Sequence, residues 1–340
     1  MRKALVIGPR YYNFLDAVET AFRDIGWECL TLGYDNPVDP YTTLNRILYK
    51  CGSISHRERM LQDSRRLFSA RALETFEKES PDLVFLMNGD MVETAALDRF
   101  RSGAKVSLWL FDNISKMPSA MTVAGHCDRL YSFDRNDVNA LREAGLDASF
   151  LPQACDTSIY RPLGSARDTD ILFVGDLYYY PNRQRLLKAV IDAFPQKKIR
   201  IIGSYKPWYK NPVKCLFRER RDIYTNHGIE PAAVNEWYNR SRVVLNIHRE
   251  DQKDGANPRV FEICSSGAYQ VCDRNPYIES LFPCNEVGLY EGADELVRQI
   301  REALDKDKSV QAAAAHRLVV ESHSYQSRVR QIVLDAGFWN

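Results

Sequence analysis

Apolar and polar residues alternate along the chain in blocks that are typical of an α/β protein. Short β-branched runs, such as residues 3–8 and 243–247, predict buried parallel strands, and stretches with apolar residues at helical spacing lie between them. At the start of the chain, the first run leads through a loop into a predicted helix at 14–25 and a strand at 27–33. This strand–helix–strand order predicts a doubly wound sheet.

The second half of the chain repeats the same pattern. Predicted strands over 170–175 and 199–204 contain Gly175 and Gly203 near their ends, where a missing side chain lets the backbone approach a ligand closely. After the strand at 243–247, Asn257 is placed as the N-cap of a helix and Pro258 as its first residue, where the missing N–H costs nothing. We therefore expect a second unit of the same architecture.

The start of this helix carries the strongest chemical signal in the sequence. Free backbone N–H groups and the helix dipole attract an anion there, and Arg259 adds a charge that can bind a phosphate with two hydrogen bonds. Glu262 shares a helix face with Arg259 and can accept hydrogen bonds from ribose hydroxyls. These residues predict a site for a nucleoside diphosphate. An Arg–Glu pair on a solvated helix face is the alternative.

Composition narrows the class of protein. Apolar residues make up 45% and charged residues 27% of the 340 residues, which is typical of a soluble globular protein with room for two domains. A formal net charge of +1 argues against a nucleic-acid partner. The first apolar run is too short for a signal peptide, so we expect a cytoplasmic protein. The eight cysteines show no C-x-x-C spacing, and we expect neither a structural metal nor disulfides.

One segment is locally basic. Residues 206–221 combine six lysines and arginines with aromatic and apolar side chains. Such a segment could lie peripherally on the anionic inner face of a membrane or contact an anionic acceptor. An exposed loop with its charged ends in water explains the same pattern.

The sequence around the predicted helix start resembles a known family signature. Asn246-Ile247-His248-Arg249, followed by Gly255-Ala256-Asn257-Pro258-Arg259-Val260-Phe261-Glu262, is similar to the donor site of group-1 glycosyltransferases, above all the CgeB-like (spore-maturation-protein-like) branch. Asp254 and Glu262 stand at the spacing of the E-x7-E pattern of related enzymes, with Asp in place of the first Glu. The resemblance implies the GT-B fold, in which two doubly wound Rossmann-like domains face each other across a cleft.

The same resemblance implies an activity and a domain organisation. It implies transfer of a sugar from a nucleotide-diphosphate donor, with UDP or GDP most expected, to the hydroxyl of a glycan, lipid-linked or protein acceptor. Residues 152–162 resemble the interdomain crossing of the family. We therefore expect an acceptor-side domain at 1–155, a donor-binding domain at 156–319, and a helix at about 320–340 that packs back onto the first domain. Cell-envelope glycan assembly is an analogy with the family.

The resemblance also proposes roles for individual residues. The expected donor-binding residues are Gly175, Gly203, His248, Arg249, Asn257, Arg259, Val260 and Glu262. The candidates for catalysis are Asp254 and Asp112; the latter follows an aromatic strand and could act as a general base on the acceptor hydroxyl, or else cap the next helix. His248 could instead be a loop histidine with its hydrogen bonds satisfied.

No bound cofactor or metal is expected, because Arg259 and the helix N-terminus can stabilise the leaving diphosphate. Two other functions fit the same phosphate site. A GT-B sugar-nucleotide epimerase would act on the donor alone, and a non-catalytic nucleotide-binding protein would bind the donor without turnover.

Overall fold

The computed structural model describes residues 1–10, 13–34, 49, 51–177, 180–203, 223–225 and 227–338. The chain divides into two compact units: unit 1 is formed by Met1–Pro152 with Tyr325–Asn340, and unit 2 by Gln153–Ser324. The sequence placed the corresponding boundaries after residues 155 and 319. The basic segment 206–221 lies outside the described residues. Among the described helices, none is long and apolar enough to cross a membrane.

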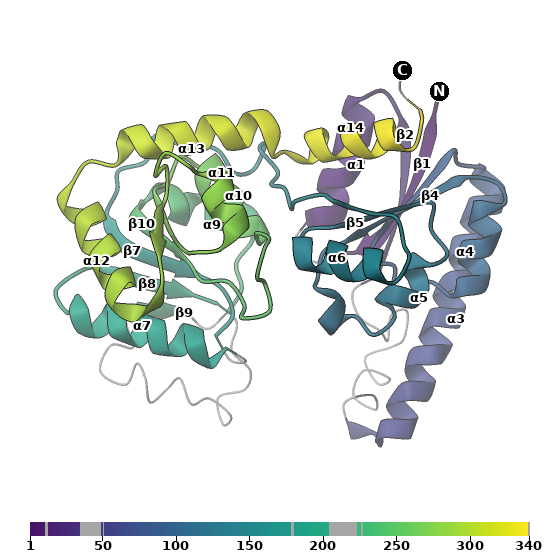
Figure 1. Cartoon of the computed structure of the whole chain (residues 1–340), viewed down its shortest axis with the longest axis horizontal. Helices are drawn as coiled ribbons and strands as arrows, with labels where there is room; N and C mark the ends of the chain where they lie inside the picture. Colours follow the sequence, from purple (N-terminus) through teal and green to yellow (C-terminus); the bar gives the residue numbers. More distant parts are fainter. Residues whose placement is uncertain are drawn as a thin grey trace. The chain divides into compact units, whose positions relative to one another are not determined.

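Unit 1 contains a parallel sheet of six strands in the order β2-β1-β3-β4-β5-β6 (Figure 1). Its central strands are mostly apolar and covered on both faces, which is why they appear as hydrophobic runs in the sequence. The strands are β1 (Lys3–Pro9), β2 (Glu28–Tyr34), β3 (Leu83–Met87), β4 (Lys105–Leu110), β5 (Arg129–Ser132) and β6 (Ala148–Phe150).

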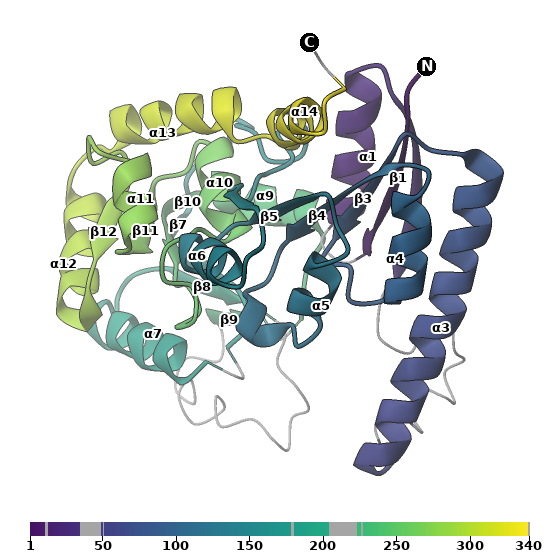
Figure 2. The ribbon, with the colours of Figure 1, turned by 45° about the vertical axis from the view of Figure 1, so that its right-hand side comes forward.

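Helices cover both faces of this sheet. On one face α1 packs against α14, a helix from the C-terminal end of the chain, and on the other α3 packs against α4 (Figure 2). The helical elements are α1 (Phe14–Asp24), α3 (Ile54–Glu79), α4 (Thr94–Arg101), the 3₁₀ turn η2 (Ile114–Lys116), α5 (Ala120–Ala124), α6 (Arg135–Glu143) and α14 (Tyr325–Asp335).

Unit 2 also contains six parallel strands, in the order β12-β11-β10-β7-β8-β9. The strands are β7 (Thr169–Val174), β8 (Ile199–Ile202), β9 (Tyr224–Thr225), β10 (Ser241–Asn246), β11 (Gln270–Asp273) and β12 (Gly288–Tyr290). Two helices, α7 and α12, fill the core on one face, and α10 packs against α9 and α13 on the other (Figure 1). The helices are α7 (Pro181–Ala193), α9 (Pro231–Asn239), α10 (Pro258–Ser265), α11 (Pro276–Leu281), α12 (Gly292–Asp305) and α13 (Ser309–Ser322).

The helix expected at about 320–340 is interrupted. Between α13 and α14, His323 and Ser324 leave the helical path, and the backbone N–H of Cys155 donates to the His323 carbonyl at 3.1 Å. The His323 ring also stacks on Phe261 of α10, with ring centroids 4.9 Å apart. These contacts hold the interruption in place within unit 2.

The strand order locates a ligand-binding edge in each unit. In each sheet, the chain first adds strands outward on one side of a switch point and then adds strands outward on the other side. The switch point lies between β1 and β3 in unit 1 and between β7 and β10 in unit 2. Doubly wound sheets bind their ligands beyond the carboxyl ends of the strands at this switch point. The predicted fold class of two doubly wound, Rossmann-like domains is confirmed.

Candidate functional site

The strand ends of unit 2 meet closely at two glycines. A Cβ atom on Gly203 would lie 2.0 Å from the carbonyl oxygen of Gly175, so the ends of β7 and β8 can approach this closely because Gly203 has no side chain. A Cβ atom on Gly175 would lie 3.7 Å from the guanidinium carbon of Arg259. The fold thus places both predicted glycines at one edge, with Arg259 beside Gly175.

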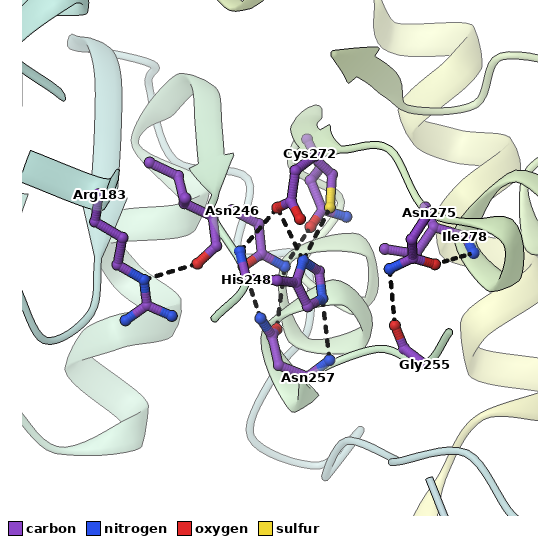
Figure 3. Close-up of polar contacts among 11 residues, drawn as sticks. Arg183, Asn246, His248, Gly255, Asn257, Cys272, Asn275 and Ile278 are labelled. Carbon is purple, nitrogen blue, oxygen red and sulfur yellow. Dashed lines mark hydrogen bonds and ion pairs between the residues drawn. The ribbon is translucent and has the colours of Figure 1, made fainter. Parts of the chain in front are cut away.

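Arg183 connects the two strands that flank the switch point. Its buried side chain donates from Nε to the Ile247 carbonyl (Figure 3) and from Nη1 to the Asp176 carbonyl, each at 2.9 Å. Ile247 follows β10 and Asp176 follows β7. One guanidinium therefore fixes the spacing of the two strand ends between which a ligand is expected to bind.

Three arginines concentrate positive charge at this edge. Burial, and then the charge of Arg259 with a smaller contribution from Arg249, lowers the pKa of Arg183 to about 10. Arg249 is partly compensated by an ion pair from its Nε to Asp251 at 3.1 Å. Arg259 and Arg249 thus lie close enough to Arg183 to lower its pKa. Such a cluster of guanidinium groups is suited to bind an anion with more than one charge, such as a diphosphate.

The helix start has the predicted residues but different contacts. Asn257 is the N-cap of α10 and Pro258 its first residue, yet the Asn257 side chain makes no capping hydrogen bond. It exchanges two hydrogen bonds with the Asn246 side chain at 3.0 and 3.1 Å (Figure 3). The Asn257 N–H donates to His248, Pro258 has no N–H and the Val260 N–H donates to the Asn257 carbonyl, so in this first turn the backbone N–H of Arg259 is the one left for an anion.

His248 is enclosed in the protein. Its Nε2 accepts a hydrogen bond from the Asn257 backbone N–H at 3.1 Å, and its Nδ1 lies 2.9 Å from Asp273 Oδ1 (Figure 3). Burial acts to raise the pKa of Asp273, but the interaction with His248 outweighs it and the pKa lies below its ordinary value. Both ring nitrogens of His248 are engaged within unit 2, so the ring does not present either of them to a donor.

In the described part of the chain, one group of side chains has the composition of a metal site. The ligand atoms of His248, Cys272 and Asp273 lie within 4.8 Å of one another. A metal on His248 Nδ1 would leave the ring proton on Nε2, which faces the Asn257 N–H. The observed hydrogen bond therefore does not fit a metal at this position.

A D-x-D sequence at Asp168 and Asp170 belongs to the opposite edge of the sheet. It lies around the amino end of β7, where the two carboxylates pair with Arg240 and Arg242 at 2.5 and 3.2 Å. These carboxylates stabilise the amino edge and are remote from the strand ends where the arginines gather.

Glu262 lies one helical turn beyond Arg259 and is largely enclosed. Burial raises the pKa of its carboxyl group to about 7, although Arg259 and a hydrogen bond with Tyr160 both act to lower it. The nearby carboxyl also contributes, after burial, to raising the pKa of Tyr238. Glu262 is thus held between aromatic hydroxyl groups and a cation, and its charge changes near neutral pH.

The remaining predicted residues lie in different places. The Val260 side chain is fully buried and its N–H donates to the Asn257 carbonyl at 3.1 Å, so Val260 packs the helix against the sheet. Asp254 is partly exposed in the loop before α10, which Asn275 fixes through a 2.9 Å hydrogen bond to the Gly255 carbonyl (Figure 3). Asp112 lies in unit 1 and is separated from the end of β4 by Phe111; the N-cap of the next turn is its neighbour Asn113.

Arg183, Tyr160 and Asp273 were not among the predicted site residues. For Arg183 the sequence does contain a signal, since it lies in the first turn of α7, where a cation opposes the helix dipole. A residue that violates this preference is expected to have another role. Tyr160 and Asp273 reach the site from separate segments, and no local pattern marks them.

Comparisons with known proteins give a family match for part of the chain and a fold for all of it. Residues 183–333 match the family model described as "Glycosyl transferase-like". Among solved structures, sucrose-phosphate synthase from Thermosynechococcus elongatus matches with a TM-score of 0.70 at 11% identity, covering 98% of each chain. A glycosyltransferase from Rickettsia africae matches with a TM-score of 0.67 at 12% identity, covering 98% of this chain and 97% of that one.

The N-terminal domain of trehalose-6-phosphate phosphatase from Candida albicans has a TM-score of 0.71 at 9% identity, over 99% of this chain and 96% of that one. No curated protein matches the sequence. At these identities the structural matches establish the fold, and the family model adds a region that contains all three arginines of the site. The chain has the GT-B fold of two Rossmann-like domains, and its residues 183–333 match the glycosyl transferase-like family model.

Proposed function

We propose that this protein is a glycosyltransferase that transfers a sugar from a nucleotide-diphosphate donor to an acceptor hydroxyl. One observation carries the proposal: Arg183, Arg249 and Arg259 gather beside the start of α10 at the switch point of unit 2. This is where a doubly wound sheet binds its ligand, and the charge is that required for a diphosphate. The family-model match over the same region supports transfer of a glycosyl group.

The site accounts for leaving-group departure without a metal. When the bond between the sugar and the diphosphate breaks, negative charge develops on the departing phosphate oxygen. The guanidinium of Arg259 and its backbone N–H in the first turn of α10 are positioned to stabilise this charge. Arg183 holds the strand ends apart by a fixed distance, Gly203 lets the end of β8 lie against the Gly175 carbonyl, and Gly175 leaves the guanidinium of Arg259 close to the backbone.

Glu262 is assigned to the ribose of the donor. An ionised carboxylate accepts hydrogen bonds from two adjacent hydroxyl groups, whereas a protonated one loses part of this capacity. Because burial raises its pKa to about 7, ribose binding by Glu262 strengthens as the pH rises through neutrality. Arg259, which acts to keep the carboxylate charged, links the ribose and diphosphate parts of the site.

The acceptor belongs to unit 1 in this proposal. Asp112 follows β4 at the carboxyl edge of the sheet and is the candidate general base for a glycan, lipid-linked or protein acceptor. Asp254 is the second candidate for catalysis, from the loop before α10. The CgeB-like branch, a UDP or GDP donor and a peripheral membrane contact through residues 206–221 remain parts of the proposal that rest on the sequence.

The test is nucleotide binding, measured by thermal shift and calorimetry with UDP, GDP, dTDP and CMP. Ligand that binds the folded state raises the melting temperature by mass action. We expect one diphosphate to bind, Arg259→Ala to weaken its binding about 100-fold, and Glu262→Ala to weaken it about tenfold, since charged hydrogen bonds contribute more than neutral ones. CMP, which lacks the second phosphate, should bind weakly.

Arg298→Ala is the matched control, because Arg298 is an exposed arginine on α12 of the same unit. If Arg298→Ala weakens binding as much as Arg259→Ala, binding reflects net charge and the assigned site is wrong. Donor hydrolysis or sugar transfer that persists with EDTA would support the metal-independent mechanism. Conversion of the sugar nucleotide without any acceptor would support an epimerase.

A further inference from the structure

Helix α10 is held at its two ends by histidines of opposite hydrogen-bonding polarity. At the N-terminal end, His248 Nε2 accepts from the Asn257 N–H at 3.1 Å. At the C-terminal end, His316 Nδ1 of α13 lies 2.8 Å from the carbonyl of Ser265, the last residue of the helix. A helix start offers donors and a helix end offers acceptors, so the first contact needs an unprotonated ring nitrogen and the second needs a protonated one.

The contacts of His248 define its protonation state. Because Nε2 accepts a hydrogen bond, it carries no proton, and the proton of the neutral ring is on Nδ1. That proton points to Asp273 Oδ1 at 2.9 Å, and the same oxygen accepts the backbone N–H of His248 at 2.8 Å. The ring is 1% exposed, so water does not substitute for either partner.

We propose that His248, in its neutral form with the proton on Nδ1, is a positioning residue that fixes the start of α10 for binding of the donor diphosphate. Asp273 on β11 accepts the Nδ1 proton and so selects this tautomer. The ring thereby links β11 to the N-cap of the helix that carries Arg259 and Glu262. The inference rests on the proposed donor site, because it concerns how that site is held.

A second set of contacts restrains the same point. The Asn257 side chain pairs with Asn246, whose amide also donates to Gln270 Oε1 at 3.1 Å, and Gln270 in turn donates to the Val260 carbonyl at 3.3 Å. These amides hold the side chain of the N-cap and the first turn of the helix. His248 instead binds the backbone N–H of the N-cap residue, Asn257, which lies two residues before Arg259.

Charging His248 works against this arrangement. A second ring proton on Nε2 would face the N–H of Asn257, which would lose its acceptor. The groups that surround the ring are Asp273 and Cys272 on β11, with Tyr290 on β12 and Arg183 on α7 close to Asp273. The hydrogen bond to Asn257 exists only with Nε2 unprotonated.

The first measurement reads the tautomer in the free protein, by two-dimensional ¹⁵N NMR of the histidine rings at pH 7.5. We expect His248 to have an unprotonated Nε2 and a protonated Nδ1. A ring with its proton on Nε2 would overturn the proposal. This result does not depend on any nucleotide. It therefore tests the proposed role of His248 separately from the proposed donor site.

The second measurement is the affinity for UDP and GDP at pH 7.5, for the wild type, His248→Gln and His248→Ala. The Gln side chain can place a carbonyl oxygen near the position of Nε2 and so keep an acceptor for the Asn257 N–H. We expect His248→Ala to bind the diphosphate about tenfold more weakly at pH 7.5, and His248→Gln to restore most of the loss.

The comparison between variants isolates His248, because titration of Glu262 and of the nucleotide phosphate affects all of them alike. His316→Gln is the matched control: it removes a histidine from the other end of the same helix, and we expect its diphosphate affinity to match the wild type. The proposal is overturned if His248→Ala binds as tightly as the wild type, or if His248→Gln binds as weakly as His248→Ala. If no diphosphate binds to the wild type, the proposed function fails, while the NMR result still shows whether His248 has the tautomer that holds the start of α10.

Discussion

The two switch points of this protein have the same backbone architecture and opposite chemistry. In unit 2, a buried guanidinium, that of Arg183, joins the ends of β7 and β10. In unit 1, short polar groups link the segment after β3 to its neighbours: the Tyr34 hydroxyl at the end of β2 donates to Asp90 Oδ1 at 2.6 Å, and Asn88 Oδ1 accepts from the Phe111 N–H, after β4, at 2.7 Å. One edge is prepared for an anion, and the other presents carboxylate, amide and hydroxyl groups.

The comparison shows that a doubly wound sheet fixes where a ligand binds but not which ligand. Both edges place backbone and side chains at the carboxyl ends of parallel strands. The residues that follow the strands set the charge. In unit 1 a cation is also present, since the Arg10 side chain lies across Gly33, but it is exposed at the surface, whereas Arg183 is enclosed. Burial makes the charge of unit 2 a fixed part of the site.

The largest expected effect concerns the close approach of strands in unit 2. In Gly203→Ala, the new Cβ would meet the Gly175 carbonyl oxygen, so the strand ends must separate. We expect a loss of about 3 kcal/mol in the free energy of unfolding, as for other overpacked sites, together with weaker diphosphate binding. Urea unfolding and calorimetry with the bound nucleotide measure both effects.

Gly228→Ala is the control for this change, because a Cβ there has no neighbour within 4 Å and its φ is not positive. It should leave stability and binding near the wild-type values. Equal effects of the two substitutions would show that the contact between the strand ends does not matter.

A smaller effect is expected from the buried carboxyl group of unit 2. The folded protein holds a proton on Glu262 up to about pH 7, whereas an ordinary glutamate loses it near pH 4.5. Its ionisation therefore reduces stability as the pH rises from about 4.5 to about 7. Glu262→Gln should raise the free energy of unfolding by about 2 kcal/mol at pH 8 and change it little at pH 4. Urea unfolding at both pH values checks this, and a constant difference between them would contradict the assigned cause.

The smallest effect is expected in unit 1. Asn88 has a left-handed backbone, with φ of 69°, and its side chain accepts the Phe111 N–H. Asn88→Ala removes this acceptor and should reduce the free energy of unfolding by about 1 kcal/mol more than Asn285→Ala does. Asn285 is an exposed residue with a similar φ of 60°, so it controls for the backbone conformation.

The same pair of variants sharpens the comparison of the two edges. Neither substitution touches the arginines of unit 2, so both proteins should bind the diphosphate like the wild type, and Asn88→Ala should slow sugar transfer. A loss of diphosphate affinity in Asn88→Ala would show that the two edges are not separate sites.

Local chemistry made a large part of this structure predictable. Strands β1, β7 and β10 appear as apolar runs because both of their faces are buried, and the start of α10 follows from Asn257 and Pro258, whose backbone preferences act over a few residues. Arg259 and Glu262 stand out for the same reason, since they share a helix face at a helix start.

Contacts between distant segments were decided by the tertiary structure. Arg183 binds the carbonyl of Ile247, 64 residues away, and His248 binds Asp273, 25 residues away. Hydrophobic periodicity records which face of an element is buried, but it does not record which residue of another element lies opposite. The sequence by itself therefore determined the elements, the fold class and the cation at the start of α10. Only the packed sheet decided that Arg183 joins the strand ends and that His248 holds the helix, because both depend on the distance between strands.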